Sequence, residues 1–363
     1  MKKLLLLILV LSLALTSLAC NFPFPDISGK MPEMPEYKVD ASAQLEFSEN
    51  GLGLMINDDK KSYSVVSIGN CTDVDVVVPS HHNGLPVVVF GELDSLNIGV
   101  FYECDFVKSI TLPDTVEVIG YTAIAFCPAL EEIILPSSLI DIRSLAIYSC
   151  NNLKKIKIPA SVAYIQPTSF EFNASLERIE VDFRNPYYKD IDGNLYTKDG
   201  KELIKYANGK KDASFKVPAL VEIIAKRAFA GNKNVESISI PWSVKEIGEN
   251  AFRECSALRE VIFSDNSTCY KIGSAAFLGC SSLEGIRLPD RLSRIESNTF
   301  NGCSSIEYIS VGTAVTYIGR RAFEGCKALK TLEYRGQKNR WESIEKEADW
   351  YFHMGDYELV FNP

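Results

Sequence analysis

A fixed spacing of cysteines constrains the fold of this 363-residue chain more than any other feature. Successive members are 23 or 25 residues apart, except where Asn173 and Asn232 stand 23 residues after Cys150 and 23 residues before Cys255. A small side chain that can bond to the backbone therefore occupies one position in nine copies. A fixed period of this length predicts a solenoid, in which each copy forms one coil. The seven cysteines at this position are Cys104, Cys127, Cys150, Cys255, Cys280, Cys303 and Cys326.

Apolar residues stand at constant offsets from this position. In the copy centred on Cys255 they are Phe252 on the amino-terminal side, and Leu258, Val261 and Phe263 on the carboxyl-terminal side. The sixth and eighth positions after the cysteine are apolar and alternate with mostly polar neighbours, which is the periodicity of a strand with one buried face. One copy cannot bury this face alone, whereas stacked copies can. The sequence therefore predicts a β-rich solenoid with one short strand per coil.

Proline and glycine mark where each coil turns. Pro241 follows the strand positions of its copy, and proline ends strands because it has no N–H to donate. The piece Val244-x-x-Ile247-Gly248 then returns the chain along the back of the coil. We expect this glycine to supply a backbone conformation with positive φ.

The repeat resembles a known family. The pattern Ile-x-Ile-Pro-x-x-Val-x-x-Ile-Gly-x-x-Ala-Phe-x-x-Cys-x-x-Leu is similar to the BspA-like leucine-rich repeats of bacterial surface proteins, and the similarity extends from about Leu45 to the carboxyl terminus. The resemblance implies a right-handed leucine-rich repeat coil with repeats of ~23 residues and a cap at each end. It also implies an association with cell-surface adhesion through host-matrix or glycan contacts.

The amino terminus has the features of an export signal. Two lysines precede an apolar run from Leu4 to Ala19, which is shorter than the ~20 residues that span a bilayer. The residues Thr16-Ser17-Leu-Ala-Cys20 resemble a bacterial lipobox, which implies lipidation at Cys20, although Ser17 replaces the usual aliphatic residue. The alternative is ordinary signal cleavage that leaves a spare cysteine.

These features predict a domain order along the chain. A signal peptide (1–19) precedes a lipidated, extended tether rich in proline, glycine and serine (20–39). An amino-terminal strand-rich cap with entry repeats (40–94) leads into leucine-rich repeat coils (95–181). A longer coil (182–219) contains a hairpin at Asp199-Gly200, further coils follow (220–335), and a carboxyl-terminal cap (336–363) closes the core with Trp341 and Trp350.

The cysteines are expected to be reduced. Equivalent positions in adjacent coils lie ~4.8 Å apart, which is within the roughly 4.4–6.8 Å that a disulfide allows between Cα atoms. Asparagine nevertheless occupies the same position as Asn173 and Asn232, and a disulfide position would not exchange with asparagine. We therefore predict buried thiols in a small polar slot, with Cys269, outside the slot, as the most exposed thiol.

Composition excludes several classes of function. The chain has a net charge of −9 and no basic stripe, so nucleic acid is a poor partner and membrane attachment must come from lipid. The three histidines and the cysteines lack zinc-ligand spacing. Asp190-Ile-Asp192-Gly-Asn194 resembles the start of a calcium loop, but Lys201 stands where that loop needs glutamate. We expect no metal, no cofactor and no catalysis.

The remaining function is binding by the outward face of the strands, at the fifth and seventh positions after the cysteine. Arginine and tyrosine are typical interface anchors. The predicted partner is an extracellular or host-surface protein or glycan, met by a monomer exported and lipid-anchored to the bacterial cell envelope, facing outward. The alternative is a structural envelope protein without a specific ligand. The predicted ligand-binding residues are Lys155, Lys157, Arg178, Glu180, Glu260, Arg287 and Tyr308.

Overall fold

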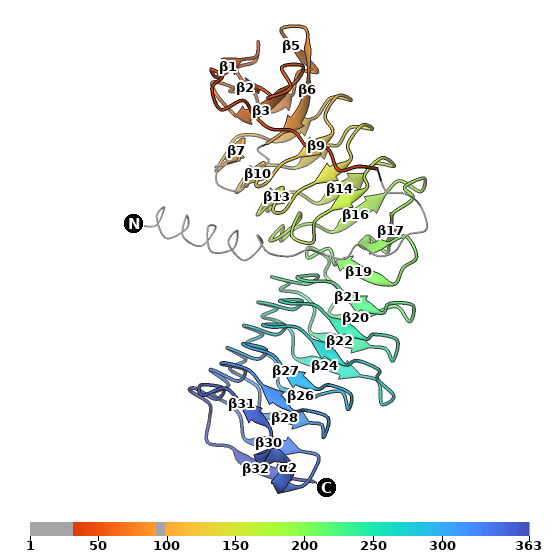
Figure 1. Ribbon diagram of the computed structural model, residues 1–363, viewed down its shortest axis with the longest axis vertical. Coiled ribbons are helices and arrows are strands. Elements are labelled where there is room, and N and C mark those ends of the chain that lie inside the picture. Colours follow the sequence, from red (N-terminus) through yellow and green to blue (C-terminus); the bar gives the residue numbers. More distant parts are fainter. Residues whose placement is uncertain (1–31, 92–98, 363) are drawn as a thin grey trace. The chain divides into compact units, whose positions relative to one another are not determined.

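A computed structural model of the chain describes residues 32–91 and 99–362, which form a solenoid of short strands (Figure 1). The chain divides into two compact units. Unit 1 comprises Met1–Asn152, Lys157–Phe170 and Asp182–Tyr187, and unit 2 comprises Leu153–Ile156, Glu171–Val181 and Tyr188–Pro363. The predictions for the signal peptide (1–19) and for lipidation at Cys20 lie outside the described residues.

Unit 1 contains three sheets. An eight-stranded sheet, with β5 paired to β6, consists of β1 (Glu46–Phe47), β2 (Gly53–Ile56), β3 (Tyr63–Ser67), β5 (His81–His82), β6 (Leu85–Phe90), β9 (Val118–Ile119), β12 (Asp141–Ile142) and β15 (Tyr164–Ile165). Two parallel three-stranded sheets consist of β4 (Asp75–Val77), β8 (Ser109–Thr111) and β11 (Glu132–Ile134), and of β7 (Phe101–Tyr102), β10 (Ile124–Ala125) and β13 (Ile147–Tyr148). A further two-stranded sheet consists of β14 (Lys155–Ile158) and β16 (Arg178–Val181), of which β16 and residues 155–156 of β14 belong to unit 2.

Unit 2 also contains three sheets. The seven-stranded sheet, all parallel, is β20 (Ser214–Lys216), β22 (Ser237–Ile240), β24 (Glu260–Phe263), β26 (Gly285–Arg287), β28 (Tyr308–Val311), β30 (Thr331–Tyr334) and β32 (Glu358–Phe361). The six-stranded sheet is β17 (Tyr188–Ile191), β18 (Asn194–Thr197), β19 (Glu202–Lys205), β21 (Ile223–Ile224), β23 (Glu246–Ile247) and β25 (Lys271–Ile272). The third is β27 (Arg294–Ile295), β29 (Tyr317–Ile318) and β31 (Glu345–Lys346), and helix α2 (Lys338–Glu342) lies in the cap.

The predicted alternation of the strands is confirmed. On β26, Ile286 is buried and Arg287 is exposed, and Leu288 directly after the strand is again buried. The same pattern holds on β14, where the two isoleucines are buried and the two lysines are exposed. Each coil buries its apolar face against the neighbouring coils, because a single coil contains no other element that could cover this face.

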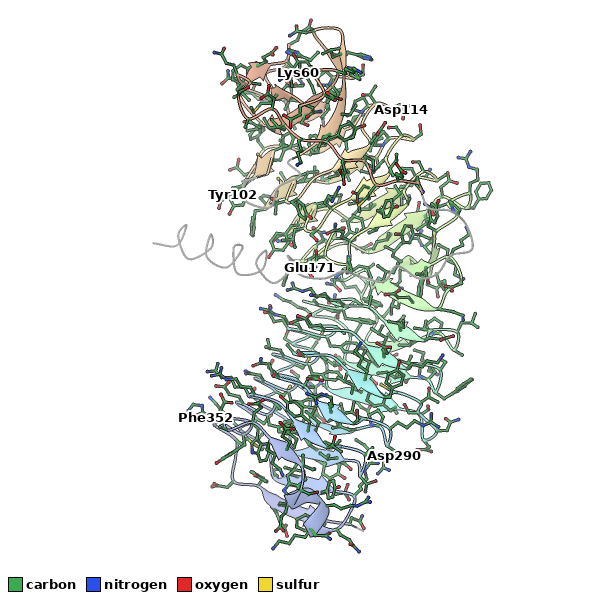
Figure 2. All side chains as sticks on the ribbon, in the orientation of Figure 1. Lys60, Tyr102, Asp114, Glu171, Asp290 and Phe352 are labelled. Carbon is green, nitrogen blue, oxygen red and sulfur yellow. The ribbon has the colours of Figure 1, made fainter. Side chains whose placement is uncertain are left out.

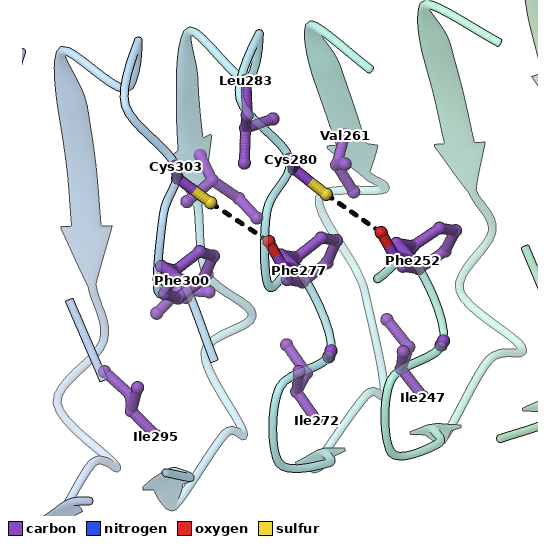
Figure 3. Close-up of a cluster of buried hydrophobic side chains, with 14 of the residues drawn as sticks. Ile247, Phe252, Val261, Ile272, Phe277, Cys280, Leu283, Ile295, Phe300 and Cys303 are labelled. Atoms are coloured by element: carbon purple, nitrogen blue, oxygen red, sulfur yellow. Dashed lines mark hydrogen bonds between the residues drawn. The ribbon is translucent and has the colours of Figure 1, made fainter. Parts of the chain in front are cut away.

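Aromatic rings form a continuous stack through the core of unit 2. Phe229, Phe252, Phe277, Phe300 and Phe323 hold the position three residues before the slot, and their successive ring centroids are 5.0, 5.2, 5.4 and 5.7 Å apart (Figure 3). All five side chains are buried. The rings stack because equal positions in successive coils are superimposed. The Trp350 ring ends the stack nearly perpendicular to Phe323, with the two ring centroids 5.8 Å apart.

The cysteine position forms the predicted polar slot. All nine cysteines in the described part of the chain are buried thiols that form no disulfide. The thiol of Cys280 donates to the carbonyl oxygen of Phe252 at 3.1 Å, and that of Cys303 donates to Phe277 at 3.2 Å (Figure 3). In the same slot Asn232 accepts from the backbone N–H groups of the following turn, at 2.8 Å from Val235. Thiol and amide therefore fill one slot because both bond to nearby main chain.

We expect these thiols to stay reduced and unreactive. Burial raises the pKa of Cys280 and of Cys303 well above its ordinary value, which removes the thiolate that reacts. Mass spectrometry after alkylation should show that these thiols react at least about tenfold more slowly in the folded chain than in the denatured chain. In the denatured, unreduced chain every cysteine of the slot should react. A disulfide between Cys280 and Cys303 would contradict the slot.

Two details of the coil differ from the sequence-based expectation. Cys269, predicted to be the most exposed thiol, is fully buried, and its thiol donates to the carbonyl oxygen of Lys271 at 3.5 Å. The expectation that Gly248, the glycine after the back strand, has positive φ is also wrong, because its φ is not positive. At Gly248 an added Cβ would lie 2.4 Å from the backbone nitrogen of Lys226, so here glycine permits close approach of the previous coil.

The coil between Cys255 and Cys280 is two residues longer than its neighbours. The strands before and after the extra residues both keep their register with the preceding coil: Val261 on β24 pairs with Ile238, and Lys271 on β25 pairs with Glu246. The extra residues therefore lie in the turn between β24 and β25, where the backbone N–H of Ser267 donates to the carbonyl of Ser264.

The interruption of the repeat contains the predicted hairpin at Asp199-Gly200, and a second hairpin that was not predicted. Strands β18 and β19 form a hairpin in which Gly200 has φ +79° and Asp199 accepts from the N–H of Lys201. A second hairpin between β17 and β18 turns at Asp192 and Gly193, both with positive φ. The carboxyl-terminal cap buries Trp341 and Trp350, as expected.

The described end of the predicted tether, residues 32–39, packs against unit 1. Tyr37 donates to the Glu117 carboxylate at 2.7 Å, Arg143 donates to the carbonyl of Pro35, and Val39 bridges to Asn57. These residues therefore differ from the extended, unpacked tether expected from composition, because Tyr37 and the Pro35 carbonyl form hydrogen bonds with Glu117, before β9, and Arg143, after β12.

Candidate binding surface

The outward face of the seven-stranded sheet carries two rows of side chains. The first row joins the residues that begin each strand, with Glu260, Gly285 and Tyr308 adjacent in register. The second row lies two residues further along each strand and includes Ile262 and Arg287. Because side chains alternate across a strand, both rows face away from the core. The sheet therefore brings together Glu260, Arg287 and Tyr308, three of the predicted binding residues, on three neighbouring strands.

Large apolar groups are exposed on this face. Ile262 is 44% exposed and Tyr308 is 38% exposed, although the strand has a buried face available for apolar side chains. Single exposed apolar residues are ordinary. These two lie on β24 and β28, on either side of β26.

Tyr308 is held in one position by its hydroxyl group, which donates to the Glu333 carboxylate on β30. Glu333 also accepts from Ser310 and, at 3.1 Å, from the amide of Asn362. Partial burial acts to raise the pKa of Glu333, but these hydrogen bonds outweigh it and the pKa lies below its ordinary value. Ser310 was expected to be exposed and is instead fully buried, because Glu333 and Tyr308 cover it.

The arginine of this face keeps most of its donors free for a partner. The Arg287 side chain is 64% exposed, and its guanidinium lies 3.8 Å from the Asp290 carboxylate. Asp290, whose side chain projects at the margin of unit 2 in Figure 2, bonds more closely to Arg335. Since Asp290 is shared, Arg287 is only weakly paired.

The other predicted binding residues lie on β14 and β16. Lys155 pairs with Glu180 at 2.7 Å, and Arg178 is 3.7 Å from the same carboxylate. Lys157 is exposed on β14. Lys155, Arg178 and Glu180 satisfy one another as a solvated ion-pair network of the kind that contributes little to stability.

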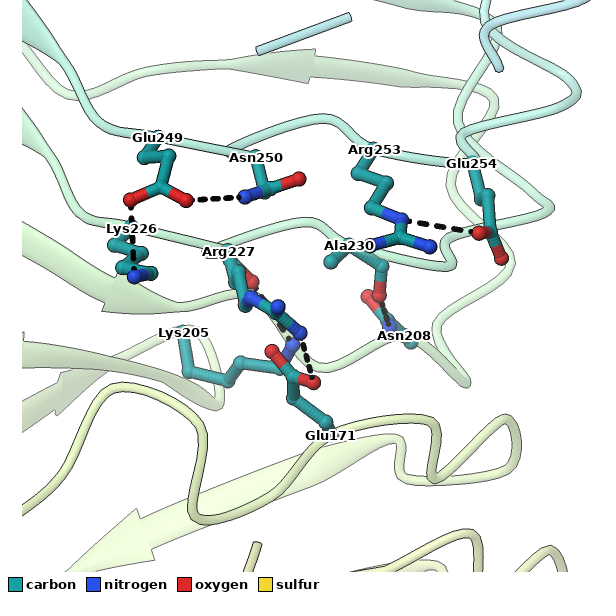
Figure 4. Close-up of polar contacts among 10 residues, drawn as sticks. All are labelled: Glu171, Lys205, Asn208, Lys226, Arg227, Ala230, Glu249, Asn250, Arg253 and Glu254. Carbon is teal, nitrogen blue, oxygen red and sulfur yellow. Dashed lines mark hydrogen bonds and ion pairs between the residues drawn. The ribbon is translucent and has the colours of Figure 1, made fainter. Parts of the chain in front are cut away.

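A group of buried charges in unit 2 escaped the sequence-based interpretation (Figure 4). The guanidinium of Arg227 donates to the Glu171 carboxylate at 2.8 Å, and both side chains are buried. The ammonium of Lys205 donates to the carbonyl of Arg227 at 3.2 Å. Burial raises the pKa of Glu171, against the opposing effect of Arg227, and burial lowers the pKa of Lys205 to about 8. Because the group is closed to solvent, it acts on stability and reaches no ligand.

No repeat position signals this group in the sequence. Glu171 stands between Phe170 and Phe172 in an ordinary coil, and Lys205 belongs to the hairpin insert, which has no periodicity. A charge directly after the core phenylalanine is no signal either, because Arg253 and Glu324 hold the same offset in their copies.

Within residues 32–91 and 99–362, no three histidine, cysteine or acidic side chains are grouped so as to hold a metal ion. None of the helices in that same part of the chain combines the length and apolar character needed to cross a bilayer.

Comparison with known proteins identifies the repeat. Residues 92–195 and 208–348 match the model of the BspA type leucine rich repeat region in six copies. A search of curated proteins found no match.

Solved structures share the fold. A leucine rich cell surface protein from Faecalibacterium prausnitzii is 23% identical, with 87% of this chain and 99% of that chain covered and a TM-score of 0.57. A leucine-rich repeat protein from Eubacterium ventriosum is 21% identical, covering 86% and 95%, with a TM-score of 0.60. The pneumococcal vaccine antigen PcpA is 16% identical, covering 90% and 100%, with a TM-score of 0.61.

Proposed function

Because the chain belongs to the family of BspA-type leucine-rich repeat proteins, we propose that it is a bacterial cell-surface protein that binds an extracellular or host-surface protein or glycan. The observation that carries the proposal is the exposed cluster on the seven-stranded sheet, where Ile262, Arg287 and Tyr308 face solvent from consecutive strands. Solenoids use such extended faces for partners. The similar protein from F. prausnitzii is described as a cell surface protein, which supports the location.

A binding assay tests this function. The full chain, immobilised and exposed to a panel of extracellular-matrix proteins and glycans, should bind at least one of them saturably. The alternative, a structural envelope protein without a ligand, gives no saturable binding across the panel. Turnover of a substrate by the purified chain would instead support an enzyme.

Tyr308→Ala should separate binding from stability. Because Tyr308 lies on the solvent side of β28, its truncation should change the free energy of unfolding by only about 0.5–1 kcal/mol. The same change should weaken the partner bound in the panel by about tenfold or more, since aromatic anchors dominate interfaces. Denaturant unfolding and binding isotherms measure the two effects.

The matched control is Tyr270→Ala. Tyr270 is 47% exposed and donates to a glutamate, Glu246, at 2.6 Å, but it precedes the back strand β25. It should leave binding unchanged. A loss of binding in both variants, or a loss of stability in Tyr308→Ala as large as that of a core substitution, would contradict the assigned binding face.

We also propose that a lipid on Cys20 anchors the protein to the cell envelope, as the lipobox-like residues before Cys20 suggest. Cys20→Ser should move the protein from the membrane fraction to the soluble fraction, because two or more acyl chains are needed for stable anchoring. Mass analysis of the wild-type protein, isolated from its own cells, should show a lipidated amino terminus. An unmodified terminus would rule the anchor out.

A further inference from the structure

The three-stranded sheet of β4, β8 and β11 in unit 1 has an exposed apolar row on its outward face. Val77 on β4 and Ile134 on β11 are both in register with Thr111 on β8, so the three side chains lie side by side across the sheet. Val77 is 61% exposed and Ile134 is 48% exposed, whereas the middle residue of each strand is buried. Because side chains alternate along a strand, the row faces away from the core. Burial of these branched side chains by a partner would be favourable, since it removes apolar surface from water.

A row of carboxylates runs beside the apolar row. Asp75 and Glu132 are both in register with Ser109, two residues before the apolar row and therefore about 6–7 Å from it. Ser109 donates to the Asp75 carboxylate at 2.7 Å, and neither acid forms an ion pair with a base among the described residues. Both acidic side chains are exposed. Two carboxylates thus stand roughly 10 Å apart, across two strand spacings, next to an apolar line.

Basic side chains close to these rows in unit 1 are balanced by other acids. Lys108 directly precedes β8, and Glu131, which directly precedes β11, holds the equivalent position in the next coil. One coil beyond β11, hydrogen bonds from Arg184 and the charge of Lys157 hold the pKa of Asp182 well below its usual range. The carboxylates of the row are therefore in excess, and the face is anionic.

These two rows limit what can cover the face. Nucleic acid or a sulfated glycan would bring negative charge to Asp75 and Glu132, and like charges disfavour such a contact. A second copy of this chain is disfavoured for the same reason, because a twofold contact joins the same patch of both copies and neither row contains a base. None of the residues of β4, β8 and β11 is aromatic, so the face has no ring on which a sugar could stack. The remaining partner is both apolar and cationic.

We propose that this face binds a protein segment in which aliphatic side chains stand beside lysine or arginine. The aliphatic groups cover the row of Val77, Thr111 and Ile134, and the cationic groups pair with Asp75 and Glu132. The charges orient the segment, and the apolar contact supplies affinity. The proposal concerns unit 1 and does not depend on the seven-stranded sheet of unit 2, to which the proposed function is assigned.

The test measures the binding of three fluorescent synthetic peptides to the full chain. The first contains only leucine and lysine, the second has glutamate in place of each lysine, and the third has glutamine in place of each leucine. The leucine–lysine peptide should bind saturably, the leucine–glutamate peptide should not bind, and the glutamine–lysine peptide should bind at least about tenfold more weakly. Affinity for the leucine–lysine peptide should fall severalfold between about 0.05 and 0.5 M salt, since salt screens exposed charges.

Substitutions in the two rows test their separate contributions. Val77→Thr combined with Ile134→Thr should weaken binding of the leucine–lysine peptide by about tenfold or more, because hydroxyl groups replace apolar ones. Asp75→Asn combined with Glu132→Gln should weaken it severalfold and reduce its dependence on salt. These positions are all exposed, so thermal unfolding of both double variants should differ little from that of the wild type.

Matched controls lie in unit 2. Leu220→Thr combined with Ile223→Thr removes exposed aliphatic groups, and Glu342→Gln combined with Asp356→Asn removes exposed carboxylates from the carboxyl-terminal cap. Both should bind the leucine–lysine peptide as the wild type does. If the threonine variant does not fold, the variant with neutral amides at 75 and 132 decides the outcome alone. Absence of saturable binding, unchanged binding in the row variants, or an equal loss in the controls would overturn the proposal.

Discussion

Phe277→Ala is expected to lower the free energy of unfolding by about 3–5 kcal/mol. Phe277 is fully buried, and its ring stacks on Phe252 at 5.2 Å and on Phe300 at 5.4 Å. Truncation removes the buried area and leaves a cavity between two coils that cannot close independently. Denaturant unfolding measures the loss, and hydrogen exchange should show that opening begins in the coils on either side of Phe277.

The control for this variant is Phe352→Ala in the carboxyl-terminal cap. Phe352 is 54% exposed, and its side chain lies at the margin of unit 2 in Figure 2. Its truncation should change the free energy of unfolding by no more than about 0.5 kcal/mol. Equal losses in the two variants would show that the ring stack is not what couples the coils.

Arg227→Met is expected to cost about 3–5 kcal/mol, because it leaves the Glu171 carboxylate buried without its ion-pair partner. Glu171 and Arg227 are both buried, and one oxygen of Glu171 already lacks a hydrogen-bond partner within the described structure. The matched control is Arg259→Met. Arg259 also pairs with a glutamate, at 3.0 Å from Glu284, but it is 60% exposed, so the loss should stay below about 1 kcal/mol.

The cost of Arg227→Met should depend on pH. Burial raises the folded-state pKa of Glu171 above its unfolded value, and removal of Arg227 raises it further. The folded variant therefore holds a proton that the unfolded chain releases, and its stability falls as pH rises above about 4.3. The difference from wild type should be larger at pH 8 than at pH 5. The double variant Glu171→Leu with Arg227→Met should recover much of the loss, and the absence of recovery would contradict a charge-based cause.

The regular part of the fold follows from the sequence because its contacts repeat. Phe252, Phe277 and Phe300 occupy one offset in their copies, and a solenoid must superimpose equal offsets. The exchange of Cys255 for Asn232 at the slot likewise predicts a bond to main chain, which both side chains make. Periodicity therefore predicts burial, strand faces and the state of the thiols.

The irregular contacts could not be predicted, since they join positions with no common offset. Glu171 and Arg227 are 56 residues apart, on either side of the hairpin insert. The position of residues 32–39 depends on Tyr37 meeting Glu117, which no local pattern specifies. The role of Gly248 was predicted wrongly because a glycine can be required either by positive φ or by a close approach of the backbone, and the sequence alone does not distinguish the two.

The candidate surface was predicted in part. Alternation along the strands places Glu260, Arg287 and Tyr308 on the outward face, and the register then brings their strands together. The bond from Tyr308 to Glu333 depends on side-chain direction, which offsets along the chain do not fix.

The longer coil between Cys255 and Cys280 shows how the solenoid tolerates insertions. Its added residues lie in the turn between β24 and β25, while Val261 and Lys271 keep their pairing with the preceding coil. The number of residues in the turn between β24 and β25 can therefore increase while both strands keep their pairing with the preceding coil. A grafted peptide at Asp265 or Asn266, both exposed, would be displayed from a fixed site without altering the stacking that carries stability. The natural two-residue insertion already lies in this turn, so the turn is a site where the solenoid accepts added residues.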